Sequence, residues 1–108
     1  MAPAAKPAVL RALAERDVAD AVEYYLAEQA FTAANGLVGE LQRALRQIGR
    51  QPAIGSTRFA HELGLPGLRS WRLRRFPYTV FYLERADHID VWRVLHERRD
   101  LPAWLAEV

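Results

Sequence analysis

The apolar residues of this 108-residue chain change their spacing once, and this change constrains the fold more than any other feature. From about residue 15 to residue 50 they recur with the helical period, whereas after Gly67 they form short alternating or continuous runs. Helices followed by strands in one short chain are typical of an α+β domain. The sequence therefore predicts one domain over residues 1–108, in which an N-terminal helical hairpin packs on a small, mainly antiparallel sheet; residues 1–7 would form a loose arm.

Two apolar stripes define the predicted hairpin. The first stripe consists of Val18, Ala21, Val22 and Tyr25, and the second of Ala34, Leu37, Val38, Leu41, Leu45 and Ile48. We expect Asp17, Asp20 and Glu23 to point away from the first stripe. Thr32 is the expected N-cap of the second helix, because its hydroxyl can accept a hydrogen bond from an unpaired amide. Pro52 is expected to end that helix.

Three strand-like runs occupy the second half of the chain. They cover residues 68–76, 78–83 and 89–96. In the first run Arg72 and Arg74 alternate with apolar residues, so we expect both guanidinium groups on one face of the strand. The third run is almost continuously apolar, which is typical of a central strand covered on both faces.

The remaining segments are less regular. Residues 8–13 are compatible with a strand or with the first turn of the helix, and the pattern does not decide between them. Residues 53–67 contain several glycines and a proline, so they are predicted to form a loop. Pro102 is expected to open a short C-terminal helix, since proline is tolerated in a first helical turn.

Composition narrows the classes of function. There are no cysteines, which excludes disulfides and thiolate ligands and favours a cytoplasmic location. His61 and His96 do not complete a zinc motif, and no stretch is long and apolar enough to cross a membrane, so we expect no metal, no cofactor and no membrane partner. Every basic residue except Lys6 is arginine, whose planar fork suits carboxylate, phosphate and aromatic partners.

Five segments in order resemble one known family. They are DVADAVEYY at 17–25, QPAIG at 51–55, LRSWRL at 68–73, YTVFY at 78–82 and DVWRVLHERRD at 90–100. Together they resemble the RelE/ParE superfamily of toxins from type II toxin–antitoxin modules, and the last segment resembles the ParE branch. The resemblance implies a short first strand, a helical hairpin and a three-stranded meander. It also implies a cognate ParD-type antitoxin as partner.

The resemblance leaves the target open, because one fold hosts two activities. ParE-type toxins inhibit DNA gyrase and block replication, whereas RelE-type toxins cut messenger RNA in the ribosome. For an endoribonuclease, the resemblance makes Arg74 the phosphate clamp and His96 the acid or base. The tail tyrosine of RelE-type enzymes is missing, because no tyrosine follows Tyr82. The sequence therefore favours gyrase inhibition, with the endoribonuclease and a binding module that has lost its toxicity as alternatives.

Candidate contact residues follow from the arginines and the ends of the chain. The expected target-binding residues are Arg72, Arg74, Arg98 and Arg99. The expected antitoxin-binding residues are Leu10, Leu101 and Trp104. We also expect Arg69 or Arg75 to pair with Asp20 or Glu23 of the first helix. The alternative to partner binding is that the arginines only form a solvated face of the strand. The alternative to catalysis by His96 is that this histidine has a structural role.

Overall fold

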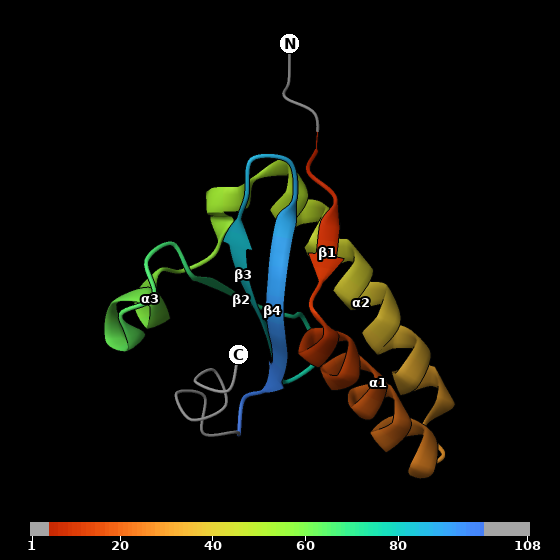
Figure 1. Ribbon diagram of the computed structural model, residues 1–108. Helices are drawn as coiled ribbons and strands as arrows, with labels where there is room; N and C mark the ends of the chain where they lie inside the picture. Colours follow the sequence, from red (N-terminus) through yellow and green to blue (C-terminus); the bar gives the residue numbers. More distant parts are fainter. Residues whose placement is uncertain (1–4, 99–108) are drawn as a thin grey trace.

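The computed structural model describes residues 5–98 and shows the predicted α+β fold (Figure 1). The elements in chain order are β1 (Ala8–Leu10), α1 (Ala12–Ala27), α2 (Phe31–Arg50), the short 3₁₀ helix η1 (Pro52–Ile54), α3 (Arg58–Leu63), β2 (Arg69–Arg72), β3 (Tyr78–Glu84) and β4 (Ile89–His96). The predicted helical hairpin and the strands that follow it are thus confirmed. Within residues 5–98, no helix combines the length and the apolar character needed to cross a membrane.

The four strands form one sheet with the order β1-β4-β3-β2. β1 runs parallel to β4, and the other neighbours are antiparallel, so the sheet is mainly antiparallel as predicted. β4 lies inside the sheet, and six of its eight residues are buried, which confirms that it is a central strand. A register shift between Phe81 and Tyr82 bends the β3–β4 pair.

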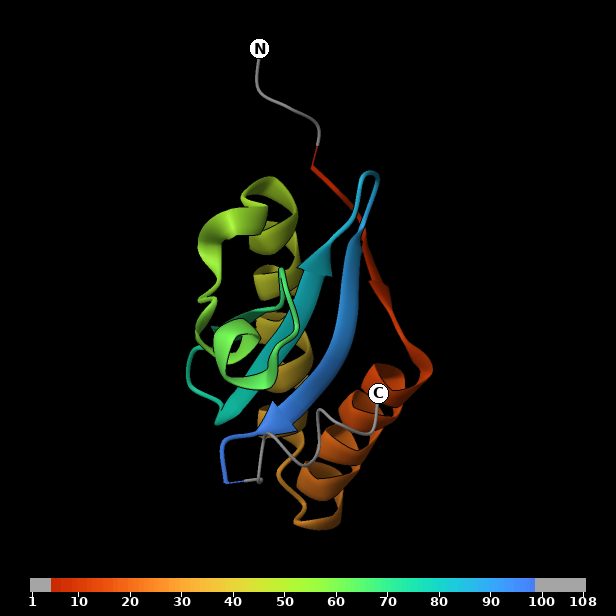
Figure 2. The same ribbon diagram turned by 60° about the vertical axis from the view of Figure 1, so that its left-hand side comes forward.

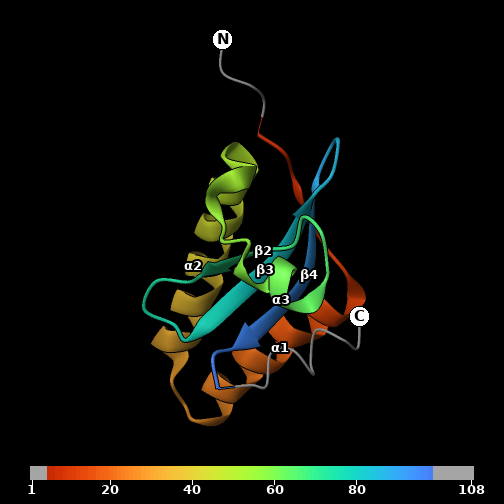
Figure 3. The same ribbon diagram turned by 90° about the vertical axis from the view of Figure 1, so that its left-hand side faces the viewer.

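Both faces of the sheet are covered, but unequally. The larger core lies between the sheet and the α1–α2 hairpin, and it includes Leu37, Leu41, Ile48, Val80 and Val91. α3 packs on the opposite face, as the rotated views show (Figures 2 and 3), where it covers a smaller cluster around Leu68, Phe81 and Leu95. The hairpin therefore contributes most of the buried apolar area that stabilises the fold.

The N-terminal boundaries of the two helices differ from the sequence predictions. Residues 8–10 form a strand, and α1 begins at Ala12, a little earlier than the periodicity indicated. α2 begins at Phe31, so the N-cap position belongs to Ala30, and no side chain caps this helix. The prediction that Thr32 is the N-cap is wrong, because Gln29 takes a left-handed conformation and the helix begins two residues earlier than expected.

The segment predicted as a loop contains α3. Phe59 on α3 packs edge to face on Phe81 of the sheet, with ring centroids 5.4 Å apart. Leu63 and Leu65 pack on the same cluster, so burial of these apolar side chains favours a helix over an open loop. Gly64 ends α3 in the left-handed conformation that glycine adopts without strain.

The segment between α2 and α3 is anchored by a buried tyrosine. The Tyr82 hydroxyl donates to the Pro52 carbonyl oxygen at 2.7 Å and accepts from the Gly55 amide at 3.0 Å. A Cβ atom at position 55 would lie 2.6 Å from that hydroxyl oxygen, so only glycine fits there. Burial raises the pKa of Tyr82. These two hydrogen bonds hold residues 52–55 of the QPAIG segment against β3, directly after α2 ends at Arg50.

The first antiparallel strand is shorter than predicted. β2 ends at Arg72, and the following residues turn toward β3. Arg75 has a φ of 65°, and the Leu73 amide donates to the Tyr78 carbonyl oxygen across the turn. The strand period therefore stops before Arg74, and the prediction that the run continues to residue 76 is wrong. The predicted C-terminal helix after Pro102 lies outside the described residues.

Candidate functional site

Asp17 joins α1 to the middle of β4. Arg93 is 2% exposed, and its Nε and Nη2 atoms donate to the two Asp17 carboxylate oxygens at 2.8 Å each. The same carboxylate accepts the Val94 amide at 3.0 Å. Asp17 was predicted to point away from the apolar stripe, and that prediction is wrong. The Asp17 carboxylate turns toward the sheet because it binds the buried Arg93 guanidinium and the Val94 amide. The Val94 amide is free to donate to it because β1 pairs with β4 only as far as Val91.

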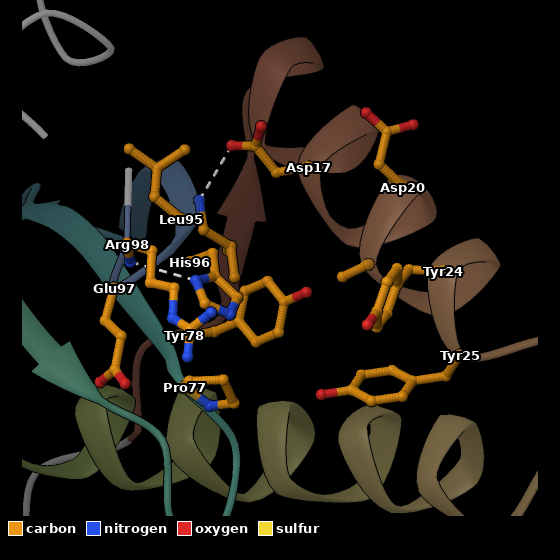
Figure 4. Close-up of a pocket in the computed structure, with 12 residues that line it drawn as sticks. Asp17, Asp20, Tyr24, Tyr25, Pro77, Tyr78, Leu95, His96, Glu97 and Arg98 are labelled. Atoms are coloured by element: carbon orange, nitrogen blue, oxygen red, sulfur yellow. Dashed lines mark hydrogen bonds between the residues drawn. The ribbon is translucent and has the colours of Figure 1, made fainter. Parts of the chain in front are cut away.

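Beyond this ion pair, a groove of about 630 Å³ opens between α1 and the end of β4 (Figure 4). We call it the α1–β4 groove. Its lining comprises Asp17, Asp20, Ala21, Tyr24, Tyr25, Pro77, Tyr78, Val94, Leu95, His96, Glu97 and Arg98. The groove exists because β1 pairs with β4 only over residues 89–91, which leaves the rest of that edge facing α1.

Three tyrosines line this groove. Figure 4 shows the hydroxyl groups of Tyr24, Tyr25 and Tyr78 turned toward the same space. The rings of Tyr24 and Tyr25 meet edge to face with centroids 5.3 Å apart, and Tyr78 meets the His96 ring in the same way at 5.2 Å. Among residues 5–98, the hydroxyls of Tyr24 and Tyr25 have no hydrogen-bond partner, so both are available to a ligand.

His96 lies at the end of β4 on the wall of the groove. Its Nδ1 atom accepts the Arg98 backbone amide at 3.0 Å, so Nε2 carries the proton of the neutral ring. This contact and the packing against Tyr78 fix the orientation of the ring. His96 can therefore donate one hydrogen bond into the groove, while its other nitrogen is already used.

Arg72 and Glu97 form an ion pair across the sheet. The Arg72 Nη2 atom lies 3.0 Å from the Glu97 carboxylate, and the two side chains are 59% and 47% exposed. Both residues line a second, shallower depression of about 460 Å³ on the α3 side of the sheet. Its other lining residues are Ile54, Ser56, Arg58, Phe59, Ser70, Trp71 and Thr79.

The prediction that Arg72 and Arg74 lie on one face of a strand is wrong, because β2 ends at Arg72 and the two arginines line different depressions. Arg74 is exposed and lies in a small depression with residues of α2, including Glu40 and Gln47. Arg69 donates instead to the carbonyl oxygens of Ala53 and Gly55, at 3.1 and 2.8 Å. The expectation that Arg69 or Arg75 pairs with the first helix is wrong, since neither Asp20 nor Glu23 has an ion-pair partner among residues 5–98.

The predicted antitoxin contacts are only partly within the described residues. Leu10 lies on β1, where it is partly buried against the larger core, whereas its neighbour Val9 is 53% exposed. Leu101, Trp104 and the arginine at position 99 lie outside the described residues.

A second charged cluster at the start of β4 was not singled out from the sequence. Asp90 accepts from Arg11 at 2.9–3.0 Å and from Arg85 at 3.0–3.1 Å, and Arg11 also stacks on the Trp92 ring at 4.3 Å. Hydrogen bonding to Arg11 lowers the pKa of Asp90 to about 2, with Arg85 adding to the effect. An aspartate within an apolar run was the only signal in the sequence.

Within residues 5–98, no three histidine, aspartate or glutamate side chains come close enough together to hold a metal ion. The polar side chains that line the α1–β4 groove can form hydrogen bonds and ion pairs.

Comparison with known proteins gives a matching family and several similar solved structures. Residues 8–101 match the family described as the ParE toxin of the type II toxin–antitoxin system parDE. A solved structure, titled as the chromosomal ParDE toxin–antitoxin system from P. aeruginosa, is similar to this chain with a TM-score of 0.69 and 15% sequence identity. The alignment covers 84% of this chain and 95% of that one, and it shows a shared fold. A search of curated proteins gave no match.

Proposed function

Since the chain belongs to the ParE family of toxins from type II toxin–antitoxin systems, we propose that a cognate ParD-type antitoxin holds it inactive and that the released toxin binds DNA gyrase and blocks replication. The match over residues 8–101 supports the family, and the similarity to a ParDE system supports an antitoxin as partner. The toxin would act in the cytoplasm, where gyrase and replicating DNA are found.

The observation that carries this proposal is the separation of the two nuclease candidates. An RNA-cleaving centre needs a phosphate clamp and an acid or base that converge on one scissile bond. Arg74 lies beside α2, whereas His96 lines the groove beside α1. Within residues 5–98 the two side chains line different depressions, so this geometry favours inhibition by binding over cleavage of RNA.

Two exposed arginines supply guanidinium groups suited to such binding, Arg72 on the α3 side and Arg74 beside α2. Arg72 and Arg74 are both exposed, and they present planar guanidinium groups to solvent. The ion pair between Arg72 and Glu97 is also exposed, and pairs of this kind contribute little to stability. Arg72 can therefore exchange Glu97 for an acidic group of a partner at small cost.

The test is a gyrase assay with the purified chain, supercoiled DNA and ATP. We expect cleaved DNA to accumulate as toxin is added, and we expect Arg72→Ala combined with Arg74→Ala to reduce this effect about tenfold or more. Arg16→Ala is the matched control, because Arg16 is an exposed arginine on α1 outside the proposed surface.

Three results would contradict the proposal. Gyrase that remains unaffected at a large excess of toxin would exclude it as the target. Cuts in codon register on translated messages, mapped by primer extension and lost in Arg74→Ala, would instead establish the endoribonuclease. Normal growth of cells that express the chain without an antitoxin would indicate a binding module without toxicity.

A further inference from the structure

We propose that the exposed face of α2 binds the phosphate backbone of duplex DNA through Arg43, Arg46 and Arg50. We call these three residues the α2 arginine row. The proposal goes beyond inhibition of gyrase, because binding to DNA alone needs no second protein. Only the choice of DNA over duplex RNA rests on the proposed function, which places the toxin beside replicating DNA.

The helical period places the three arginines together on the side of α2 that faces solvent. Spacings of three and four residues bring side chains to the same face of a helix, and all three arginines are exposed. The core lies against the opposite face, where Leu41 and Ile48 are buried. At a rise of 1.5 Å per residue the row extends for about 10 Å, which is about three base-pair steps of a duplex.

The charge of α2 is unbalanced in a way that suits a polyanion. α1 carries four acids and one arginine, whereas α2 carries three arginines and one acid. That acid, Glu40, makes a loose contact of 3.8 Å with Arg43, whose side chain is 61% exposed. Arg46 and Arg50 have no ion-pair partner among residues 5–98. Arginines one turn apart on a helix repel each other, and a row of phosphates would relieve this repulsion.

The helix dipole accounts for only one of the three arginines. Positive charge is favourable in the last turn of a helix, and Arg50 lies there. Arg46 and Arg43 lie one and two turns earlier, where the effect of the dipole has fallen off. Their position on the same face is therefore better explained by an anionic partner than by stabilisation of the helix end.

The rest of this face favours a duplex over a single strand. α2 contains no aromatic residue after Phe31, whereas single-stranded nucleic acids are usually held by stacking on aromatic rings. Gly39 lies one turn before Arg43, and a Cβ atom there would meet no other atom within 4 Å, so this part of the face is open to a broad partner. Arg74 lines the same small depression as Arg43 and adds a fourth guanidinium beside the row.

The experiment measures binding of the purified full chain to a fluorescent DNA duplex by anisotropy, without gyrase and at several salt concentrations. Three phosphate contacts predict a slope of about −2.7 for the logarithm of the binding constant against the logarithm of the salt concentration. At 50 mM salt, the loss of one contact should weaken binding about tenfold. Arg46→Gln combined with Arg50→Gln should therefore weaken it about a hundredfold and reduce the slope to about −0.9.

The matched control removes the same charge elsewhere. Arg16→Gln combined with Arg58→Gln changes exposed arginines of α1 and α3, so the slope should stay near about −2.7. Circular dichroism of both double variants would check that the helices are retained.

A variant that adds a charge gives a result that loss of folding cannot imitate. Gly39→Arg places another arginine one turn before Arg43 in open space, and it should tighten binding about tenfold at 50 mM salt. Ala19→Arg is its control, because it adds the same charge at an exposed position of α1 and should have little effect.

Several results would overturn the proposal. Absence of binding at 50 mM salt would do so, as would equal losses in the two double variants, because net charge alone would then explain the affinity. Polyglutamate of matched charge that displaces the duplex equally well would identify an acidic protein as the occupant, and tighter binding to an RNA duplex would identify RNA. None of these measurements includes gyrase, so the proposal can fail while the proposed function holds.

Discussion

Two carboxylates hold the same strand, but in different surroundings. Asp17 forms an ion pair with Arg93 in the middle of β4, and the two side chains are only 10% and 2% exposed. Asp90, at the start of β4, is equally buried, but its partners Arg11 and Arg85 are 40% and 46% exposed. Both clusters pair an aspartate with arginine, but the guanidinium group is buried in the first and partly exposed in the second.

Because of this difference in solvent access, we expect the two ion-pair clusters to contribute differently to the free energy of unfolding. Removing one partner of a buried pair leaves an uncompensated charge and unpaired hydrogen-bonding groups, which is strongly destabilising. Removing one arginine from the Asp90 cluster leaves a second arginine and water to replace it. We therefore expect the Asp17 pair to control whether α1 stays on the sheet, and the Asp90 cluster to adjust stability with pH.

Arg93→Ala should have the largest effect on stability. It leaves the Asp17 carboxylate facing the sheet without its guanidinium, and we expect the free energy of unfolding to fall by about 3–5 kcal/mol. Urea unfolding followed by circular dichroism would measure this change. Asp17→Asn should cost less, because the amide oxygen can still accept the Val94 amide at the strand edge.

Arg58→Ala is the control for this comparison. Arg58 is 71% exposed, makes a loose pair with Glu62 one helical turn away at 3.6 Å, and lies 5.1 Å from the centre of the Phe59 ring. Its loss should change the free energy of unfolding by less than about 0.5 kcal/mol. Equal effects of Arg93→Ala and Arg58→Ala would show that burial does not strengthen the Asp17 pair.

The same comparison shows what could be predicted from the sequence about the fold. The apolar stripe of α1, the stripe of α2 and the continuous apolar run of β4 all predicted their elements, because burial on one or both faces leaves a clear period. α3 was missed because its stability comes from Phe59 packing on Phe81, which lies far away in sequence. A helix of six residues is too short to leave a period of its own.

The candidate site was less predictable, for a related reason. The sequence identified His96, Arg72 and Arg98 as residues of interest, but it could not show that the first and last border a groove with three tyrosines. Asp17 was placed on the solvent side because charged residues on an amphipathic helix usually lie there. Its partner Arg93 is 76 residues away, and only the register of β4 against α1 brings the two together.

The Asp90 cluster should make stability depend on acid. Its folded pKa of about 2 lies below the unfolded value near 3.9, so the stabilisation is complete above about pH 5 and is lost as pH falls toward 2. Because the two arginines are partly solvated, we expect a contribution of about 1 kcal/mol. Measuring unfolding of the wild type and of Asp90→Asn between pH 7 and pH 2 tests this expectation.

The difference between the two proteins is the informative quantity, because other acids titrate over the same range. It should be about 1 kcal/mol at pH 7 and should shrink toward zero at pH 2, where the wild-type carboxylate is becoming protonated. A difference that stays constant with pH would mean that Asp90 stabilises the fold by packing and not by charge. In that case the Asp90 cluster would not make stability depend on pH, and it would not differ from the Asp17 pair in the way proposed above.

Among the three ion-pair clusters, loss of the pair between Arg72 and Glu97 should have the smallest effect on stability, because both of its side chains are exposed. Both side chains are about half exposed, so Glu97→Gln should change the free energy of unfolding by no more than about 0.5 kcal/mol, and 0.5 M salt should reduce the difference further. Urea unfolding at low and high salt measures both quantities.

A larger loss that salt does not reduce would show that Arg72 is held as firmly as Arg93. Arg72 would then be a poor candidate for exchanging Glu97 for a partner. A small loss leaves its guanidinium available to bind, which is the property that the target-binding surface requires.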